Sequence, residues 1–209
     1  MAEIATERTF DLPPATMEAP PRPGALIPRT IVPLRGLPVV GVVLIGLIAA
    51  IASNKLWALD FFHVVGGGLW TGVDLFVGLI VGPILGRLSI PARAEFSARF
   101  MPKMMLLMPT LVTVTLAAGW QLGMYKGFVN AGYPYHEWAV ASYIVVAVMA
   151  VVALGVLEPA NIAVLFEMRK PEPDGEVISK LMSRFVWAAG ITGVMQVATL
   201  VIMTKLASG

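Results

Sequence analysis

Three ionisable side chains stand inside one strongly apolar stretch of this sequence, Trp57 to Leu85. They are Asp60, His63 and Asp74, and at about 100° per residue they fall on one face of a helix. Ionisable groups in a membrane helix are costly and usually face a protein interior, a ligand or a water-filled path. The pattern therefore predicts a membrane protein with one polar helix face of imidazole and carboxyl groups, which also carries Gly67, Thr71 and Gly78.

His63 is the residue on this face that is best suited to bind a metal. Asp60 precedes it by three residues, so its carboxylate is expected to lie within reach of one ring nitrogen. A hydrogen bond there would fix the tautomer and leave the other nitrogen free to act as a ligand. Two alternatives stay open at this point: Asp60 is simply solvated at the membrane interface, or His63 is hydrogen-bonded inside the bundle without a metal.

A haem iron held by His63 would take its second axial ligand from another helix. Met124, Met203 and Gln121 are expected at a comparable depth, and His136 is expected somewhat shallower, at the outer start of the fourth span. The alternative for His136 is an ordinary loop position.

Asp74 is expected to face polar groups of the later apolar segments. Glu158 and Asn161 lie in the fourth segment, and Gln196 lies in the fifth. A pair of carboxyl groups in this region could support a proton path, or it could form a static hydrogen-bonded clasp between helices.

Glycines flank the histidine in the run Gly66-Gly67-Gly68 and at Gly72. Small residues let another helix, or a flat cofactor, approach the backbone closely. Gly68 and Gly72 have the four-residue spacing that is frequent in packed membrane helices. Trp70 lies too deep for an interfacial tryptophan, so it is expected to pack against a cofactor ring or to fill the core.

The composition is typical of a membrane protein. Of the 209 residues, 57% are hydrophobic and only 13% are charged, and the mean hydropathy is +0.81. A soluble domain has about 25% charged residues. The absence of cysteine excludes disulfides and thiolate metal sites. We attribute the pI near 9.0 to membrane topology and expect the lipid bilayer, not nucleic acid, as the partner.

Five apolar segments are long enough to cross about 30 Å of hydrocarbon. They predict an all-α integral membrane bundle over residues 37–209. Residues 1–36 form a proline-rich tail that we expect to be disordered, since eight of the 16 prolines occur by residue 38. A kink or helix end is expected near Pro159. The five spans cover approximately residues 37–53, 57–84, 104–124, 138–166 and 185–205.

Basic residues alternate with the five crossings. Twelve of the 15 lie in the tail or in the second and fourth connections, and three lie elsewhere. The positive-inside rule therefore predicts a cytoplasmic N-terminus and a C-terminus on the opposite side. The twelve are Arg8, Arg22, Arg29, Arg35, Arg87, Arg93, Arg99, Lys103, Arg169, Lys170, Lys180 and Arg184.

The second span contains Phe62-His63-Val64-Val65-Gly66, then Leu69-Trp70-Thr71-Gly72 and Asp74-Leu75-Phe76, and closes with Gly82-Pro83. This pattern resembles the signature of small bacterial membrane proteins, the copper-resistance D-type proteins and the J-type protoporphyrinogen oxidases. The resemblance implies a bundle of four or five helices and, as in several members, b-type haem held by the histidine. It implies His63 as an axial ligand, with Trp70 and Gly72 packed around it.

Three functions follow as alternatives. The first is a haem-binding electron-transfer or oxidoreductase component of a bacterial inner membrane. The second is a non-catalytic subunit that packs against other membrane subunits or another copy of the chain. The third is a metal or proton-coupled transporter that uses Asp74 and Glu158, against which stand the small size and the lack of an inverted repeat. The sequence assigns no catalytic residue.

Overall fold

The fold is an all-α bundle, as the sequence predicts. The computed structural model describes residues 33–130, 132 and 135–208, so most of the expected tail lies outside the described residues. Within the described residues there are helices and short connections but no strand. Five helical rods are long and apolar enough to cross a membrane: Leu34–Ser53, Leu56–Arg87, Ile90–Lys126, Tyr135–Glu167 and Gly175–Ser208.

Two of the rods contain a π-helical turn. Each turn directly precedes a Gly-Pro or Glu-Pro pair, at Pro83 and Pro159. Proline lacks an N–H group and clashes with the carbonyl four residues earlier, and a π turn changes the local hydrogen-bond ladder. The irregularity expected near Pro159 is therefore a π turn inside a continuing helix. The rods consist of α1 (Leu37–Ser53), α2 (Leu56–Phe76), the turn Val77–Val81, α3 (Gly82–Arg87), α4 (Ile90–Lys126), α5 (Tyr135–Val152), the turn Ala153–Leu157, α6 (Glu158–Glu167) and α7 (Gly175–Ser208).

Helices α4 and α7 begin well before the spans predicted from hydropathy. The segment after Arg87 was expected to be a loop up to residue 103, yet α4 starts at Ile90. Pro91 in the first turn and the ion pair between Glu95 and Arg99, 2.6 Å long and one turn apart, suit a helix in a polar setting. Hydropathy detects the apolar part of a helix and not its polar extension.

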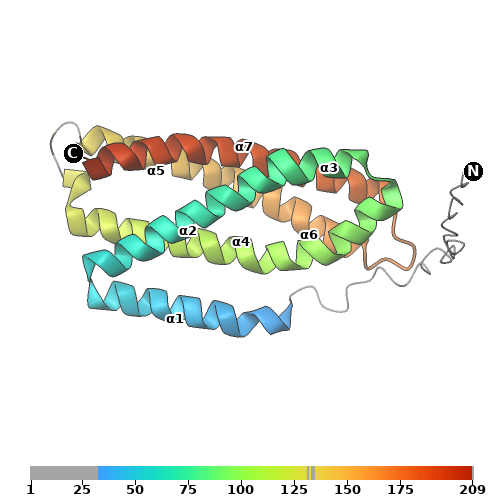
Figure 1. Cartoon of the computed structure of the whole chain (residues 1–209), viewed down its shortest axis with the longest axis horizontal. Helices are drawn as coiled ribbons and strands as arrows, with labels where there is room; N and C mark the ends of the chain where they lie inside the picture. The colour runs from blue at the N-terminus through green and yellow to red at the C-terminus, as the bar shows by residue number, and fades with distance from the viewer. Residues whose placement is uncertain (1–32, 131, 133–134, 209) are drawn as a thin grey trace, which may run out of the picture.

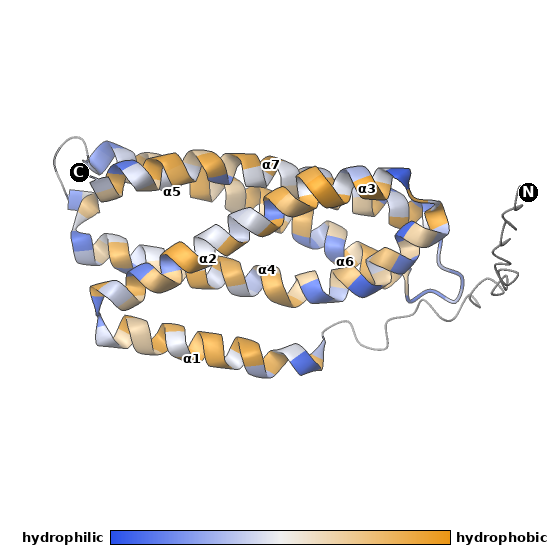
Figure 2. Ribbon diagram, in the orientation of Figure 1, coloured by the Kyte–Doolittle hydropathy of each residue, from blue (hydrophilic) through white to orange (hydrophobic). Residues whose placement is uncertain are grey.

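The polar residues gather at the two ends of the rods, which are apolar along most of their length (Figure 2). We call the end that contains the α3–α4 and α6–α7 connections the basic end, because Arg87, Arg93, Arg169 and Lys170 lie there. The opposite end, which we call the C-terminal end, contains the α1–α2 turn and the end of α7 (Figure 1).

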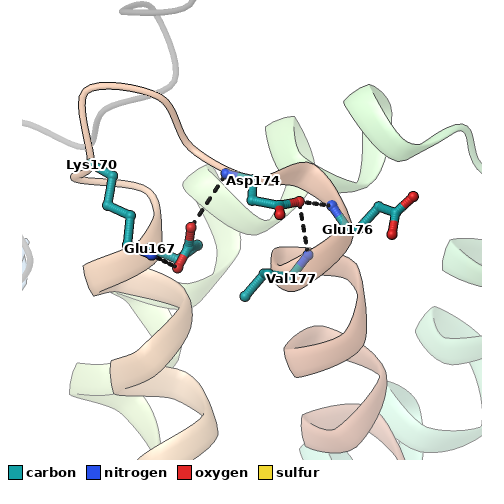
Figure 3. Close-up of polar contacts among 5 residues, drawn as sticks. All are labelled: Glu167, Lys170, Asp174, Glu176 and Val177. Carbon is teal, nitrogen blue, oxygen red and sulfur yellow. Dashed lines mark hydrogen bonds and ion pairs between the residues drawn. The ribbon is translucent and has the colours of Figure 1, made fainter.

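Side chains fix the α6–α7 connection at the basic end (Figure 3). Glu167 is only 7% exposed, accepts an N–H from Asp174 at 3.3 Å and forms an ion pair with Lys170 at 2.6 Å. Asp174 in turn accepts the backbone N–H groups of Glu176 and Val177 at 2.8 and 3.2 Å. This is the usual way in which an aspartate caps the N-terminus of a helix.

Arg93 performs a similar role between α3, α4 and α7. Its guanidinium donates to the carbonyl groups of Gly86 and Leu88 at the end of α3, at 2.8 and 2.9 Å. It also donates to the hydroxyl of Ser179 on α7 at 2.9 Å. Arg93, which the sequence analysis counted only among the basic residues that predict the topology, therefore joins α3, α4 and α7 at the basic end.

The rod that contains α2 crosses the bundle diagonally. It packs on α1 and α4 at its start and on α7 at its end (Figure 1). Glycines permit both contacts: a Cβ at Gly66 would lie 2.7 Å from Thr115 Oγ1, and a Cβ at Gly78 would overlap the Cα of Gly190. Small residues thus allow these helices to cross closely, a feature that is frequent where membrane helices pack.

Gly68 and Gly72 do not take part in these contacts. Both are exposed, and a Cβ added at either would meet nothing within 4 Å. Their four-residue spacing therefore does not pack helices within this chain. The packing glycines of the same rod are Gly66 and Gly78.

Candidate functional site

The polar face predicted for α2 points into the bundle. Thr71 and Asp74 are buried, and the remaining four residues, Asp60, His63, Gly67 and Gly78, are half-buried. The face divides into two separate regions. His63 lies where α2 meets α4, and Asp74 lies where α2 meets α7.

One ring nitrogen of His63 is fixed by the backbone of α4. Nδ1 lies 2.9 Å from the carbonyl oxygen of Thr115. Because a carbonyl oxygen only accepts, Nδ1 must carry the hydrogen, so in the neutral ring Nε2 keeps its lone pair. Nε2 makes no hydrogen bond with the described residues and is not one of their fully buried unpaired atoms. It is therefore accessible and ready to act as a ligand.

The position of the ring depends on a glycine of α4. A Cβ added to Gly119 would lie 2.6 Å from both Nδ1 and Cε1 of His63. Only a residue without a side chain at this position lets the imidazole rest on the α4 backbone and reach Thr115. The sequence shows Gly119 but gives no sign that it faces His63, because the pairing depends on how two helices cross.

Asp60 does not orient His63. It is half-buried and forms no hydrogen bond or ion pair with the residues that the structure describes. The expected hydrogen bond from the ring to the Asp60 carboxylate is replaced by one from His63 Nδ1 to the Thr115 carbonyl oxygen. The reason is the close α2–α4 approach, which brings a helix carbonyl to the imidazole.

The residues proposed as second ligands lie on three different helices, α4, α5 and α7. His136 lies in the first turn of α5 and Met203 lies on α7, whereas the His63 ring contacts α4. Helix α7 meets the rod that contains α2 near Asp74 and Gly78. Met124 lies on α4 and is 56% exposed. Gln121, expected beside His63, donates instead to Asn54 at 3.1 Å.

Asp74 forms the second region, at the crossing of α2 and α7. Its Oδ2 accepts hydrogen bonds from Gln196 Nε2 at 2.7 Å and from Thr192 Oγ1 at 3.1 Å. The expected contact with Gln196 is therefore confirmed. Neither Glu158 nor Asn161 hydrogen-bonds to this carboxyl.

Thr192 is the residue of this region that the sequence reasoning missed. It precedes Gln196 by four residues in the otherwise apolar stretch 185–198, so the two side chains share one face of α7. That spacing is the signal that could have found it.

Trp70 fills the core between the two regions. It is 5% exposed and packs with Leu111 and Met149. Gly67 makes a looser contact, since a Cβ there would lie 3.4 Å from Thr115 Cγ2. Trp70 therefore has the core position that the sequence offered as one of two alternatives.

No preformed metal cluster accompanies these regions. Within the described residues there is no group of three or more His, Cys, Asp or Glu side chains that could hold a metal ion. A shallow cavity of about 310 Å³ lies elsewhere, at the basic end of α4. It is lined by Ala92, Glu95, Phe96, Arg99, Phe100 and Lys103.

Comparison with protein-family models, curated proteins and solved structures found no match. The resemblance of the second span to the copper-resistance D-type and J-type oxidase proteins therefore stays a prediction. The fold and the site define a bundle of five helices long enough to cross a membrane, with an imidazole held by a backbone carbonyl of α4 and a carboxyl group buried between α2 and α7.

Proposed function

We propose that this chain is a multi-pass protein of the bacterial inner membrane that binds b-type haem through His63. In this proposal it acts as an electron-transfer or oxidoreductase component, with its N-terminus in the cytoplasm. The observation that supports it is the His63 ring, whose Nδ1 is held by the Thr115 carbonyl while Nε2 is accessible and unpaired among the described residues.

The residues around His63 fit a haem ligand. Histidines that bind metals commonly donate their other N–H to a backbone carbonyl or carboxylate, which fixes the ring and raises its basicity. Gly119 on α4 leaves room for the ring, since a Cβ there would lie 2.6 Å from it. Bound haem would supply one-electron redox chemistry at its iron, and the chain would supply the orientation of the imidazole and an apolar surrounding. His136, Met124 and Met203 remain the proposed sources of a second ligand.

Titration of hemin into the detergent-solubilised protein tests this proposal. We expect a saturable increase of a Soret band, because one imidazole nitrogen of defined orientation is available. Asp60→Asn is the matched control and is expected to bind hemin as the wild type does, since Asp60 forms no hydrogen bond with the described residues. An absorbance that grows linearly without saturation, as with detergent alone, would contradict the proposal.

A second candidate function is that of a non-catalytic subunit of a larger complex or a homo-oligomer. Its support is the pair Gly68 and Gly72, which lies on the outward face of α2 with open space above it. Such spacing suits the approach of another membrane helix. Transport through Asp74 and Glu158 has less support, because the two carboxyl groups share no hydrogen bond.

A further inference from the structure

Asp74 is held deep inside the bundle, away from any surface. Its side chain is 2% exposed, and the backbone of α7 lies directly against it. A Cβ added to Gly193 would be 3.2 Å from the Asp74 carbonyl carbon and 3.0 Å from Leu75 N. The carboxyl group therefore has to find all its partners inside the bundle.

No cationic side chain accompanies this carboxyl group. The side chains that lie against it are Trp70 from α2 and Thr192 and Gln196 from α7. The ion pairs of the described residues lie elsewhere and join Arg99 to Glu95, Lys170 to Glu167 and Lys180 to Glu176. A buried charge without a counter-charge is strongly unfavourable.

Ionisable residues of the neighbouring helices also stay apart from Asp74. Lys103 on α4 and Arg184 on α7 are exposed, and Glu158 at the start of α6 is half-buried. None of them forms a hydrogen bond or ion pair with Asp74. Two clusters of buried apolar side chains flank Asp74. One contains Val77, Val81, Met101, Met104 and Ala189, and the other contains Trp70, Leu111 and Met149.

Thr192 can serve this carboxyl group either as a donor or as an acceptor. Its hydroxyl has one hydrogen but three acceptors in reach: Asp74 Oδ2 at 3.1 Å, Ala188 O at 3.1 Å and Ala189 O at 2.9 Å. When the hydroxyl donates to Asp74, it suits a carboxylate. When it donates to its own helix, its lone pairs face Oδ2 and suit a protonated carboxylic acid.

Gln196 has the same double capacity. Its Nε2 donates to Asp74 Oδ2 at 2.7 Å, while its Oε1 is buried without a hydrogen-bond partner in a side chain that is 4% exposed. Rotation of the amide by half a turn would present Oε1 to Oδ2, and oxygen and nitrogen differ little in size. In that orientation a proton on Asp74 would satisfy the orphaned oxygen.

We propose that Asp74, Thr192 and Gln196 form a binding site for a single proton inside the bundle. Proton uptake forms one O–H bond on the Asp74 carboxylate and neutralises it, and release returns the proton to water. In the protonated state the new O–H group donates to one of the two partners, Thr192 Oγ1 or Gln196 Oε1, and that partner changes from donor to acceptor while the other keeps donating. The site rests on the α2–α7 contact and does not depend on haem at His63.

Infrared difference spectroscopy of the purified protein tests the site. We expect a carbonyl-stretching band of a protonated carboxylic acid that shifts to lower frequency in D₂O and is lost in Asp74→Asn. Glu158→Gln is the matched control and is expected to keep the band. Retention of the band in Asp74→Asn, or a wild-type spectrum with carboxylate bands alone at every pH at which the protein stays folded, would overturn the proposal.

Two further measurements keep the test decisive if Asp74→Asn does not fold. Thr192→Val and Gln196→Leu keep the carboxyl group but remove one partner each, so each is expected to shift the frequency of the band. An unshifted band in both variants would contradict the assignment to this cluster.

Replacing choline by sodium as the cation of the buffer salt, at constant pH, is expected to leave the band unchanged. Loss of the band on addition of sodium would identify a metal-cation site instead.

Discussion

Replacing His63 with alanine is expected to abolish the Soret band of hemin bound to this protein while leaving the bundle folded. The variant removes the only imidazole nitrogen that the α2–α4 contact holds in a fixed orientation. The Thr115 carbonyl loses one donor but remains within the hydrogen-bond ladder of α4. Absorption spectroscopy measures the haem, and circular dichroism with size-exclusion chromatography measures the fold.

Gly119→Ala separates the position of the imidazole from its presence. The added Cβ would overlap the His63 ring at 2.6 Å, so the ring must leave the Thr115 carbonyl. Loss of a group that orients a metal ligand typically lowers affinity by about 10- to 100-fold, and we expect a decrease of this size in the affinity for hemin.

His136→Ala is expected to change the spectrum only if His136 supplies the second ligand. Wild-type hemin binding in His63→Ala would exclude the proposed site.

Gly78→Ala is expected to be the most destabilising single-methyl change in the bundle. The new Cβ would overlap the Cα of Gly190 and lie 2.9 Å from its nitrogen, and these are backbone atoms that cannot rotate away. Helices α2 and α7 would have to separate at the crossing that also holds Asp74 against Thr192. Overpacking of this kind costs about 1–3 kcal/mol. Thermal unfolding in detergent, followed by circular dichroism, measures the effect.

Two glycine variants provide matched controls for Gly78→Ala. A Cβ at Gly190 would meet Gly78 Cα at 3.4 Å, an ordinary contact, so Gly190→Ala is expected to be nearly neutral. Gly86→Ala adds a methyl group into open space and is expected to cause no loss. Equal destabilisation by all three substitutions would show that the effect comes from helix propensity or detergent, not from the crossing.

Hydropathy predicts the helical rods well because each rod contains a continuous apolar stretch that is long enough to cross a bilayer. Helix α1 begins and ends at the residues predicted, Leu37 and Ser53. The early starts of α4 and α7 could not be predicted in the same way, since charged residues such as Arg93, Glu95, Glu176 and Lys180 interrupt the apolar pattern of their first turns. Capping by Asp174 and the bonds of Arg93 stabilise these extensions, and both depend on the contacts of the folded chain.

The candidate site was predictable in its residue types but not in its partners. Periodicity placed His63 and Asp74 on the inward face of α2, and the structure agrees. The partner of His63 is a backbone carbonyl, which has no sequence signature, and it reaches the ring only because residue 119 is glycine. Asp74 and Glu158 share no hydrogen bond, because the partners of Asp74 lie on α7 and not on α6.

The measurement that tests the central claim most directly is the visible absorption spectrum of the protein purified from membranes, oxidised and then reduced with dithionite. We expect a Soret band that shifts on reduction, together with the α and β bands of a b-type haem. A colourless protein that gains no such spectrum after incubation with hemin would contradict haem binding at His63. The subunit function would then become the leading explanation of this fold.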